Sequence, residues 1–142
     1  MSLPPISHLR NLIVAQEGFS QFPYLDTDGV MTIGYGRNLV DRGISAPEAL
    51  YLLDQDIFYF QQKLRDNLEC FDDLNEARQI ALISMCFNLG VNGFLKFDKM
   101  IRALDRGRYD VAACEMLESK WATQVGKRAT DLARIIESGE LA

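Results

Sequence analysis

The chain has 142 residues, 48% of them apolar and 25% charged, which is the balance of one soluble globular domain or of two small lobes sharing a core. A formal net charge of -5 and a pI of about 4.8 argue against nucleic acid and against anionic membranes as partners. The three cysteines form no CxxC pair and His8 is the only histidine, which favours reduced thiols and argues against a metal site.

The first predicted elements are a helix and a β-hairpin. Apolar residues at helical spacing predict a helix over about residues 5–16, closed by Glu17. A strand at residues 22–26, the turn signal Asp28-Gly29 and a returning strand at residues 30–36 predict the hairpin.

The rest of the chain is predicted to be helical. Ser45 and Glu48 form a capping box at the start of a helix over about residues 46–68. At 1.5 Å per residue that helix is roughly 35 Å long, which suggests a strut between two lobes. Four further helices are predicted at residues 76–89, 94–104, 110–120 and 127–138. The first of these four is almost entirely apolar, so we expect it at the centre of the main lobe.

The candidate chemistry lies in residues 17–36, EGFSQFPYLDTDGVMTIGYG. Glu17 follows Ile13 by four residues and so continues the apolar face of the first helix. Partial burial and the negative end of the helix dipole would both raise the pKa of Glu17, as a general acid near neutral pH requires. The alternative is a solvated glutamate at a frayed helix end.

Asp26 is expected at the end of a strand, where exposure and nearby backbone N–H groups keep it ionised. An ionised carboxylate suits a general base or an electrostatic stabiliser. The alternative is that Asp26 only forms the hairpin, as aspartates before glycine turns commonly do. We expect Asp28 to have that hairpin-forming role.

Thr32 contributes to the same site only if it shares a face of the hairpin with Asp26. A two-residue loop would pair Asp26 with Met31 and point Thr32 to the opposite face. A three-residue loop over residues 27–29 pairs Asp26 with Val30 and places Thr32 on the same face, and we predict this loop. The alternative is a threonine that simply favours a strand.

Two carboxylates in different ionisation states, flanking a cleft, are what glycoside hydrolysis requires. The motifs here resemble those of the phage-type lysozymes, glycoside hydrolase family 24: Glu17-Gly18, Tyr24-Leu25-Asp26, Gly29 and Thr32-Ile33-Gly34-Tyr35-Gly36. Residues 78–90 are similar to the family's buried central helix, and Ser119-Lys120-Trp121 with Gln124 and Arg128 to its tryptophan-bearing segment. The resemblance spans about residues 6–139 and is weakest at residues 40–74 and 96–108.

The resemblance implies an α+β, mainly helical lysozyme-like fold, in which a long helix joins a small β-hairpin lobe to a helical lobe. Residues 1–142 would form a single lysozyme-like domain. About residues 18–44 would form the small β-containing lobe, and about residues 69–142 the helical lobe, packed with the N-terminal helix.

The implied activity is hydrolysis, with inversion, of the β-1,4 bond between N-acetylmuramic acid and N-acetylglucosamine in peptidoglycan. Glu17 would be the general acid, Asp26 would handle the attacking water and Thr32 would hold that water. Inversion requires carboxyl groups roughly 6.5–9.5 Å apart, so that water fits between them. Arg128 would pair with Glu17 from the other lobe.

Substrate contacts are implied at Asn38, Phe87, Asn88 and Arg128. Asn88 is either a satisfied core amide or a sugar contact. Trp121 is expected in the core rather than as a sugar platform, because that is its place in the family and because a lone tryptophan is usually core.

The sequence departs from the family in two respects. Arg37 stands where many members carry histidine. The net charge of -5 predicts weaker electrostatic steering toward anionic walls than in the strongly basic members. A local basic cleft rim from Arg37, Lys127 and Arg128 would offset this.

We therefore expect a monomeric phage or prophage endolysin for host lysis, acting on peptidoglycan glycan strands without a metal or cofactor and without nucleic-acid or membrane partners. With neither a signal peptide nor a membrane span, it is expected in the cytoplasm of the producing cell and to reach the wall after release by another agent. The principal alternative is a catalytically weak or inactive glycan-binding module on the same fold, supported only by the acidic pI. A toxin or effector catalytic domain with the same chemistry ranks third.

Overall fold

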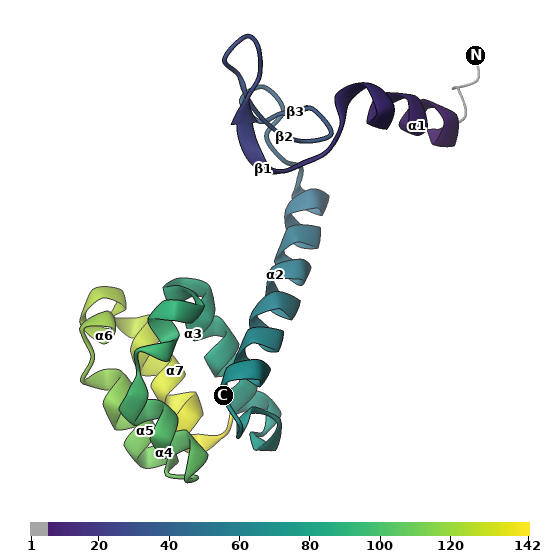
Figure 1. The fold of residues 1–142 in the computed structure, drawn as a ribbon. Coiled ribbons are helices and arrows are strands. Elements are labelled where there is room, and N and C mark those ends of the chain that lie inside the picture. The colour runs from purple at the N-terminus through teal and green to yellow at the C-terminus, as the bar shows by residue number, and fades with distance from the viewer. Residues whose placement is uncertain (1–5) are drawn as a thin grey trace. The chain divides into compact units, whose positions relative to one another are not determined.

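The computed structural model describes residues 6–142 and divides the chain into two compact units. Unit 1 ends at Tyr51 and unit 2 runs from Leu52 to Ala142, so the boundary falls inside helix α2 (Ala46–Asn67). The elements are labelled in Figure 1. Mainly helical, with one small antiparallel sheet, the chain confirms the predicted α+β class.

Unit 1 contains α1 (Ile6–Glu17) and a three-stranded sheet of β1 (Ser20–Leu25), β2 (Met31–Gly34) and β3 (Arg37–Asn38). Helix α1 ends one residue later than predicted, where the Gly18 N–H donates to the Val14 carbonyl at 2.9 Å. The predicted helix start, residue 5, lies outside the described residues.

The hairpin between β1 and β2 has the predicted three-residue loop. The Asp26 N–H donates to the Val30 carbonyl at 2.9 Å, and Tyr24 pairs with Thr32. Side chains alternate between the two faces of a strand, so this register places Asp26, Tyr24 and Thr32 on one face. The prediction of the odd loop is therefore confirmed.

The predicted strand at residues 30–36 is wrong at its end. Gly34 and Gly36 both have a positive φ, of 69° and 84°, and the chain turns there and returns as β3. Glycine adopts such angles without steric cost, which is why the G-x-G spacing makes a turn rather than a longer strand. The turn brings Asn38 opposite Thr32.

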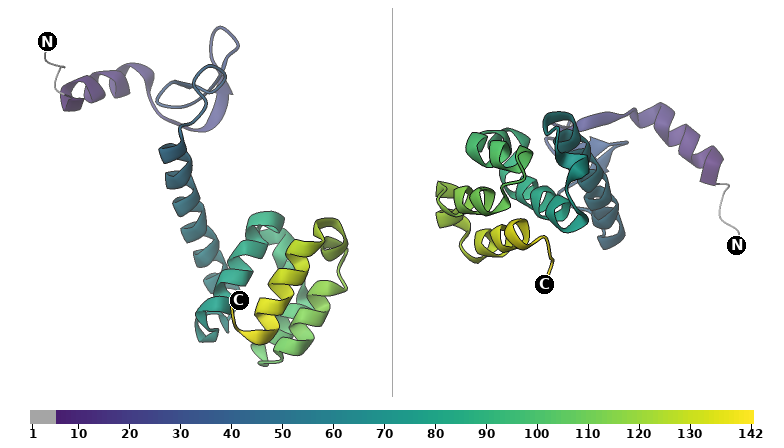
Figure 2. Two further views of the ribbon diagram at one scale, coloured as in Figure 1. Left: turned by 180° about the vertical axis from the view of Figure 1, so that it is seen from behind. Right: turned by 90° about the horizontal axis from the view of Figure 1, so that it is seen from below.

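Unit 2 is a helical bundle. After the C-terminal part of α2 come the helical segments η1 (Phe71–Asp73), α3 (Glu76–Leu95), α4 (Asp98–Asp105), α5 (Tyr109–Leu117), α6 (Lys120–Val125) and α7 (Lys127–Ser138). Helix α7 packs against α3, α5 and α6, and α5 also packs against α4 (Figure 2).

Two helix predictions in unit 2 are wrong in their bounds. The helix predicted at residues 94–104 begins at Asp98, because α3 continues past a break at Gly90, whose φ is 74°. The helix predicted at residues 110–120 ends at Leu117, and a further helix, α6, begins at Lys120, where the Ser119 hydroxyl accepts from the Ala122 N–H at 3.1 Å. Helix α7 has the predicted bounds, and Gly139 caps its C-terminal end.

The buried apolar side chains among the described residues all lie in unit 2, between Leu64 and Ile136. Helix α3 contributes six of them, which confirms its central place. Its N-terminal end is tied to the end of α7 by polar contacts. Arg78 Nε donates to the Ile136 carbonyl at 2.7 Å, and Asn75 Nδ2 donates to the Gly139 carbonyl at 2.9 Å.

Within residues 6–142, no single helix has the length and hydropathy of a membrane span, and only α3 and α4 taken together, bent by 101°, pass on those two measures. In the same residues, no three His, Cys, Asp or Glu side chains lie close enough together to hold a metal ion. All three cysteines are free thiols. Burial raises the pKa of Cys86 to about 12.

Candidate functional site

Glu17, the last residue of α1, is seated against the turn between β2 and β3. A Cβ atom at Gly36 would lie 3.0 Å from Glu17 Oε2 and 3.2 Å from its Cδ. A side chain at position 36 would therefore require the Glu17 carboxyl to shift, in addition to the strain of the positive φ. The sequence does not specify which residue approaches Gly36.

An aromatic pair next to this contact fixes the same junction. The Phe19 and Tyr35 rings lie with their centroids 5.4 Å apart, and Ser20 pairs with Gly34. The chain leaving α1 is therefore held to β2 by backbone pairing and by ring contact. These contacts position Glu17 relative to the hairpin.

Asp26 accepts the backbone hydrogen bonds of the hairpin loop. Its Oδ1 accepts from the N–H groups of Asp28 and Val30, both at 2.9 Å. The hairpin-forming role expected for Asp28 therefore belongs to Asp26, because an aspartate that precedes its loop can reach the N–H groups two and four residues ahead. The two bonds hold the carboxylate in one orientation and involve only one of its oxygens.

Thr32 is the one buried polar residue among those described, with 4% of its surface exposed. Its hydroxyl donates to the Val30 carbonyl at 2.8 Å. A hydroxyl oxygen that has given its proton to a carbonyl retains lone pairs, so Thr32 Oγ1 can still accept a hydrogen bond. It shares a face of the sheet with Asp26.

Asn38 stands opposite Thr32 in β3, which brings this predicted substrate contact to the same sheet. Its amide is used locally: Oδ1 accepts from the Asp41 N–H at 2.9 Å, and Nδ2 donates to Asp41 Oδ2 at 3.2 Å. These bonds hold the turn that follows β3. A role in sugar binding stays a prediction.

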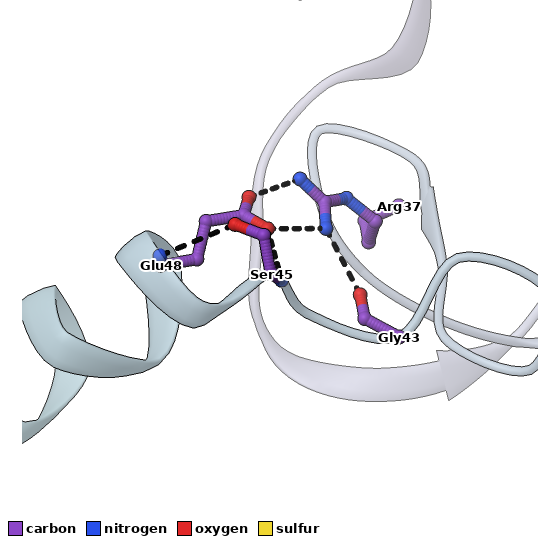
Figure 3. Close-up of polar contacts among 4 residues, drawn as sticks. All are labelled: Arg37, Gly43, Ser45 and Glu48. Atoms are coloured by element: carbon purple, nitrogen blue, oxygen red, sulfur yellow. Dashed lines mark hydrogen bonds and ion pairs between the residues drawn. The ribbon is translucent and has the colours of Figure 1, made fainter.

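Arg37 joins the sheet to the start of α2 (Figure 3). Its guanidinium bonds both oxygens of Glu48, with Nη1 at 3.0 Å from Oε1, and Nη1 also donates to the Gly43 carbonyl at 2.9 Å. Glu48 further accepts from the Ser45 N–H at 2.8 Å, which completes the predicted capping box. The Arg37 guanidinium, with help from Ser45, lowers the pKa of Glu48 to about 2.

The burial expected for Glu17 is not present in unit 1. Glu17 is exposed, and α1 contains no buried residue, Ile13 included. The helical spacing is correct, but it specifies only which residues share a face and not what covers them. Asp26 is half-buried, against the exposure expected for it.

The predicted site residues of unit 2 lie on α3 and α7. Asn88 is exposed, and its Oδ1 accepts from Trp121 Nε1 at 2.6 Å. Trp121 is buried, which confirms its expected place in the core. The Phe87 ring lies 4.9 Å from that of Phe60, so Phe87 packs partly against α2.

Two of the three cations considered for a basic rim, Arg37 and Lys127, lie next to a carboxylate. Arg37 is bound to Glu48, and Lys127 Nζ lies 2.8 Å from Asp131 Oδ2. The Arg37 pair lies within unit 1, whereas the Lys127 side chain is 87% exposed and its pair is weak. Arg128 is exposed at the start of α7, and its pairing with Glu17, a residue of the other unit, stays a prediction.

Three known proteins are similar to this chain over nearly its whole length. "Probable T4-type lysozyme 2" and "Probable T4-type lysozyme 1" of Dictyostelium discoideum are 25% and 24% identical to it, over 96% of this chain and 97% of their own. "Pre-baseplate central spike protein Gp5" of Enterobacteria phage T4 is 26% identical over 96% of this chain, which corresponds to 29% of the spike protein.

A family model described as phage lysozyme matches residues 14–135. That range includes Glu17, the complete hairpin with Asp26 and Thr32, the α3 segment with Asn88, and Arg128. The match covers most of the chain, so this protein belongs to the phage lysozyme family.

Proposed function

We propose that this chain is a muramidase that hydrolyses the β-1,4 bond between N-acetylmuramic acid and N-acetylglucosamine in peptidoglycan. Membership of the phage lysozyme family supports a lysozyme-like function and the glycoside hydrolase class. The arrangement of Glu17, Asp26 and Thr32 in unit 1 supports the specific reaction.

Glu17 is the proposed general acid. Cleavage of a glycosidic bond requires a proton on the leaving oxygen as the bond to the anomeric carbon breaks. The Glu17 carboxyl rests against Gly36, where no side chain separates it from the turn of the sheet. This contact places the carboxyl beside the turn of the sheet, the position from which we propose that it delivers the proton.

Asp26 and Thr32 are proposed to handle the attacking water. Asp26 Oδ1 is occupied by two backbone N–H groups, which leaves the second oxygen to accept a proton from water. Thr32 has donated its own proton to Val30, so its oxygen can accept the second hydrogen of the same water. Water attacking from the face opposite the leaving group gives the inverted anomer.

The observation that carries the proposal is the hairpin register. Pairing of Asp26 with Val30 places Asp26 and Thr32 on one face of the sheet, and the other hairpin register would separate them. Glu17 is held against the turn of that same sheet.

The proposal is tested on purified peptidoglycan by counting the reducing ends released. We expect Glu17→Gln and Asp26→Asn each to lower kcat by about 10²-fold or more, the range for general acid or base groups. Asp28→Asn is the matched control, because Asp28 is an exposed aspartate in the same loop and only its backbone N–H is bonded to Asp26. Its kcat should stay near that of the wild type.

Thr32 is tested with two substitutions. Thr32→Val keeps the shape and removes the hydroxyl, whereas Thr32→Ser keeps the hydroxyl. We expect kcat to fall in the valine variant and to be largely retained in the serine variant, with the KM for glycan unchanged in both. Proton NMR of the first product should show the α-anomer, and a β-anomer would contradict inversion.

We further propose that the protein is a phage or prophage endolysin, made in the cytoplasm and active on the wall after release. A glycan-binding module without activity is the competing function, since the net charge of -5 opposes binding to anionic walls. Glycan binding by the wild type without any new reducing ends would favour that module and reject the muramidase.

A further inference from the structure

Residues 96–108 form a basic segment in an acidic protein. This segment carries five of the chain's 15 lysines and arginines against two carboxylates, Asp98 and Asp105. All five cations are exposed: Lys96, Lys99, Arg102, Arg106 and Arg108. The local charge is thus opposite in sign to that of the whole chain.

These cations line a continuous groove, here called the α4–α5 groove. It consists of two hollows of about 480 and 390 Å³. Lys99, Arg102 and Glu115 line both hollows, which therefore adjoin. Lys96 lines only the larger hollow, and Arg106 and Arg108 line only the smaller.

The cations of the groove form few ion pairs within the described part of the protein. In the described part of the chain, Lys96, Lys99, Arg102 and Arg106 form no ion pair. Arg108 is 3.4 Å from Asp110, with both side chains 61% exposed, so that pair is weak. Arg37, Arg65 and Lys127 each lie closer to a carboxylate than Arg108 does.

Carboxylates interrupt the basic lining. Asp98, Glu115 and Glu118 all line the larger hollow. An anion with charges at every position would meet these carboxylates, as duplex nucleic acid would with one charge per roughly 1.7 Å. A flexible chain with anionic groups separated by neutral units can place its charges on the cations and its neutral units beside the carboxylates.

We propose that the α4–α5 groove binds an anionic phosphodiester polymer whose phosphates are separated by neutral polyol units. On envelopes that carry such polymers, the groove would hold the enzyme near its substrate, a consequence that rests on the proposed muramidase function. A concave groove suits a chain better than a flat bilayer. The binding itself does not depend on catalysis.

The binding is tested with fluorescently labelled poly(glycerol phosphate) and the full chain, by anisotropy. We expect Kd to rise steeply with salt, because each phosphate contact releases counterions. The double substitution Lys99→Glu with Arg102→Glu should weaken binding by about tenfold or more. Lys99→Gln with Arg102→Gln should have a smaller effect in the same direction, and it keeps the test open if charge reversal disturbs folding.

The matched control is Lys120→Glu with Arg134→Glu. Both residues are exposed, lie in unit 2 outside the groove, and form no ion pair within residues 6–142, so the change in net charge is the same. We expect its Kd to stay within about twofold of the wild type. An equal loss of affinity in the two double variants would show that only net charge matters, and it would contradict binding at the groove.

Two competing ligands complete the binding test. Tighter binding to duplex DNA of equal phosphate number, or to phosphatidylglycerol vesicles, than to poly(glycerol phosphate) would also overturn the proposal.

A parallel assay compares cleavage of walls with and without attached polymer, and the groove variant should be slower only on polymer-bearing walls. If the wild type cleaves no wall but still binds the polymer, the muramidase proposal is rejected and the binding proposal is not.

Discussion

The two units of this protein are stabilised in different ways. Unit 2 buries an apolar core that includes Phe71, Phe94 and Trp121. Within the described residues, the only buried side chain of unit 1 is that of Thr32. In unit 1, strand pairing, the Phe19–Tyr35 ring contact and local hydrogen bonds therefore fix the local geometry.

Those local contacts are the ones that position the proposed catalytic groups. Asp26 closes the hairpin loop, Gly36 makes room for Glu17, and Arg37 joins the sheet to α2 through Glu48. The candidate chemistry thus lies in the unit whose described residues bury only one side chain, that of Thr32. Substitutions in unit 2 should therefore act mainly on stability, and those in unit 1 mainly on turnover.

The largest expected effect is on the core of unit 2. Phe94 is fully buried, and Phe94→Ala should lower the free energy of unfolding by about 3–5 kcal/mol, since it leaves a cavity. The matched control is Phe22 in β1, which is 69% exposed. Phe22→Ala should change the free energy of unfolding by no more than about 0.5 kcal/mol. Urea unfolding followed by circular dichroism measures both, and equal losses would remove the distinction between the units.

The second prediction separates backbone strain from displacement of Glu17. Gly36→Ala and Gly34→Ala both place a Cβ on a residue with positive φ and should each cost about 1–2 kcal/mol of stability. Only the Cβ at position 36 meets Glu17, so kcat on peptidoglycan should fall about tenfold or more in that variant alone.

A similar kcat in the two glycine variants would mean that the seat of Glu17 against Gly36 is unimportant for turnover. Both variants should be checked by thermal unfolding, so that the activities are compared on folded protein.

The third prediction concerns the bond between Asn88 and Trp121. Asn88→Ala removes the acceptor of the Trp121 indole N–H and should lower the free energy of unfolding by about 1–2 kcal/mol. In a Trp121→Phe background the same substitution should cost much less, because no N–H is left without a partner. A large rise in KM with little loss of stability would instead identify Asn88 as a sugar contact.

The smallest effect is expected from the ion pair of unit 1. The pKa of Glu48 falls from an ordinary value of 4.5 to about 2, so the pair stabilises the fold above pH 4.5. That stabilisation should be lost as the pH falls from 4.5 to about 2. The difference in melting temperature between wild type and Glu48→Gln should shrink over this window, and a constant difference would show that the pair contributes nothing.

Features encoded by neighbouring residues were predictable. The three-residue loop was not one of these, because Asp28-Gly29 also allows a two-residue loop, and it was predicted from the requirement that Asp26 and Thr32 share a face. The start of α2 follows from Ser45 and Glu48, and the end of α7 from Gly139. Each depends on hydrogen bonds within about four residues of chain, where the residue types alone specify the geometry.

Features made by distant residues were not predictable. The hydrogen bond from Trp121 to Asn88 joins residues 33 positions apart in the sequence. The contact between the Glu17 carboxyl and Gly36 joins a helix end to a turn of the sheet. Strand β3 was missed because a two-residue strand has no periodicity to detect.

The sequence by itself determined the α+β class, the order of the first helix, the hairpin and the long helix, and which acid, base and hydroxyl are candidates. Tertiary structure alone decided that the Glu17 carboxyl contacts Gly36, that Arg37 is bound to Glu48, and that the cations of residues 96–108 line a groove together with residues of α5. The physical reason is range: hydrogen bonds within a turn depend on a few adjacent residues, whereas contacts between elements depend on how the whole unit packs.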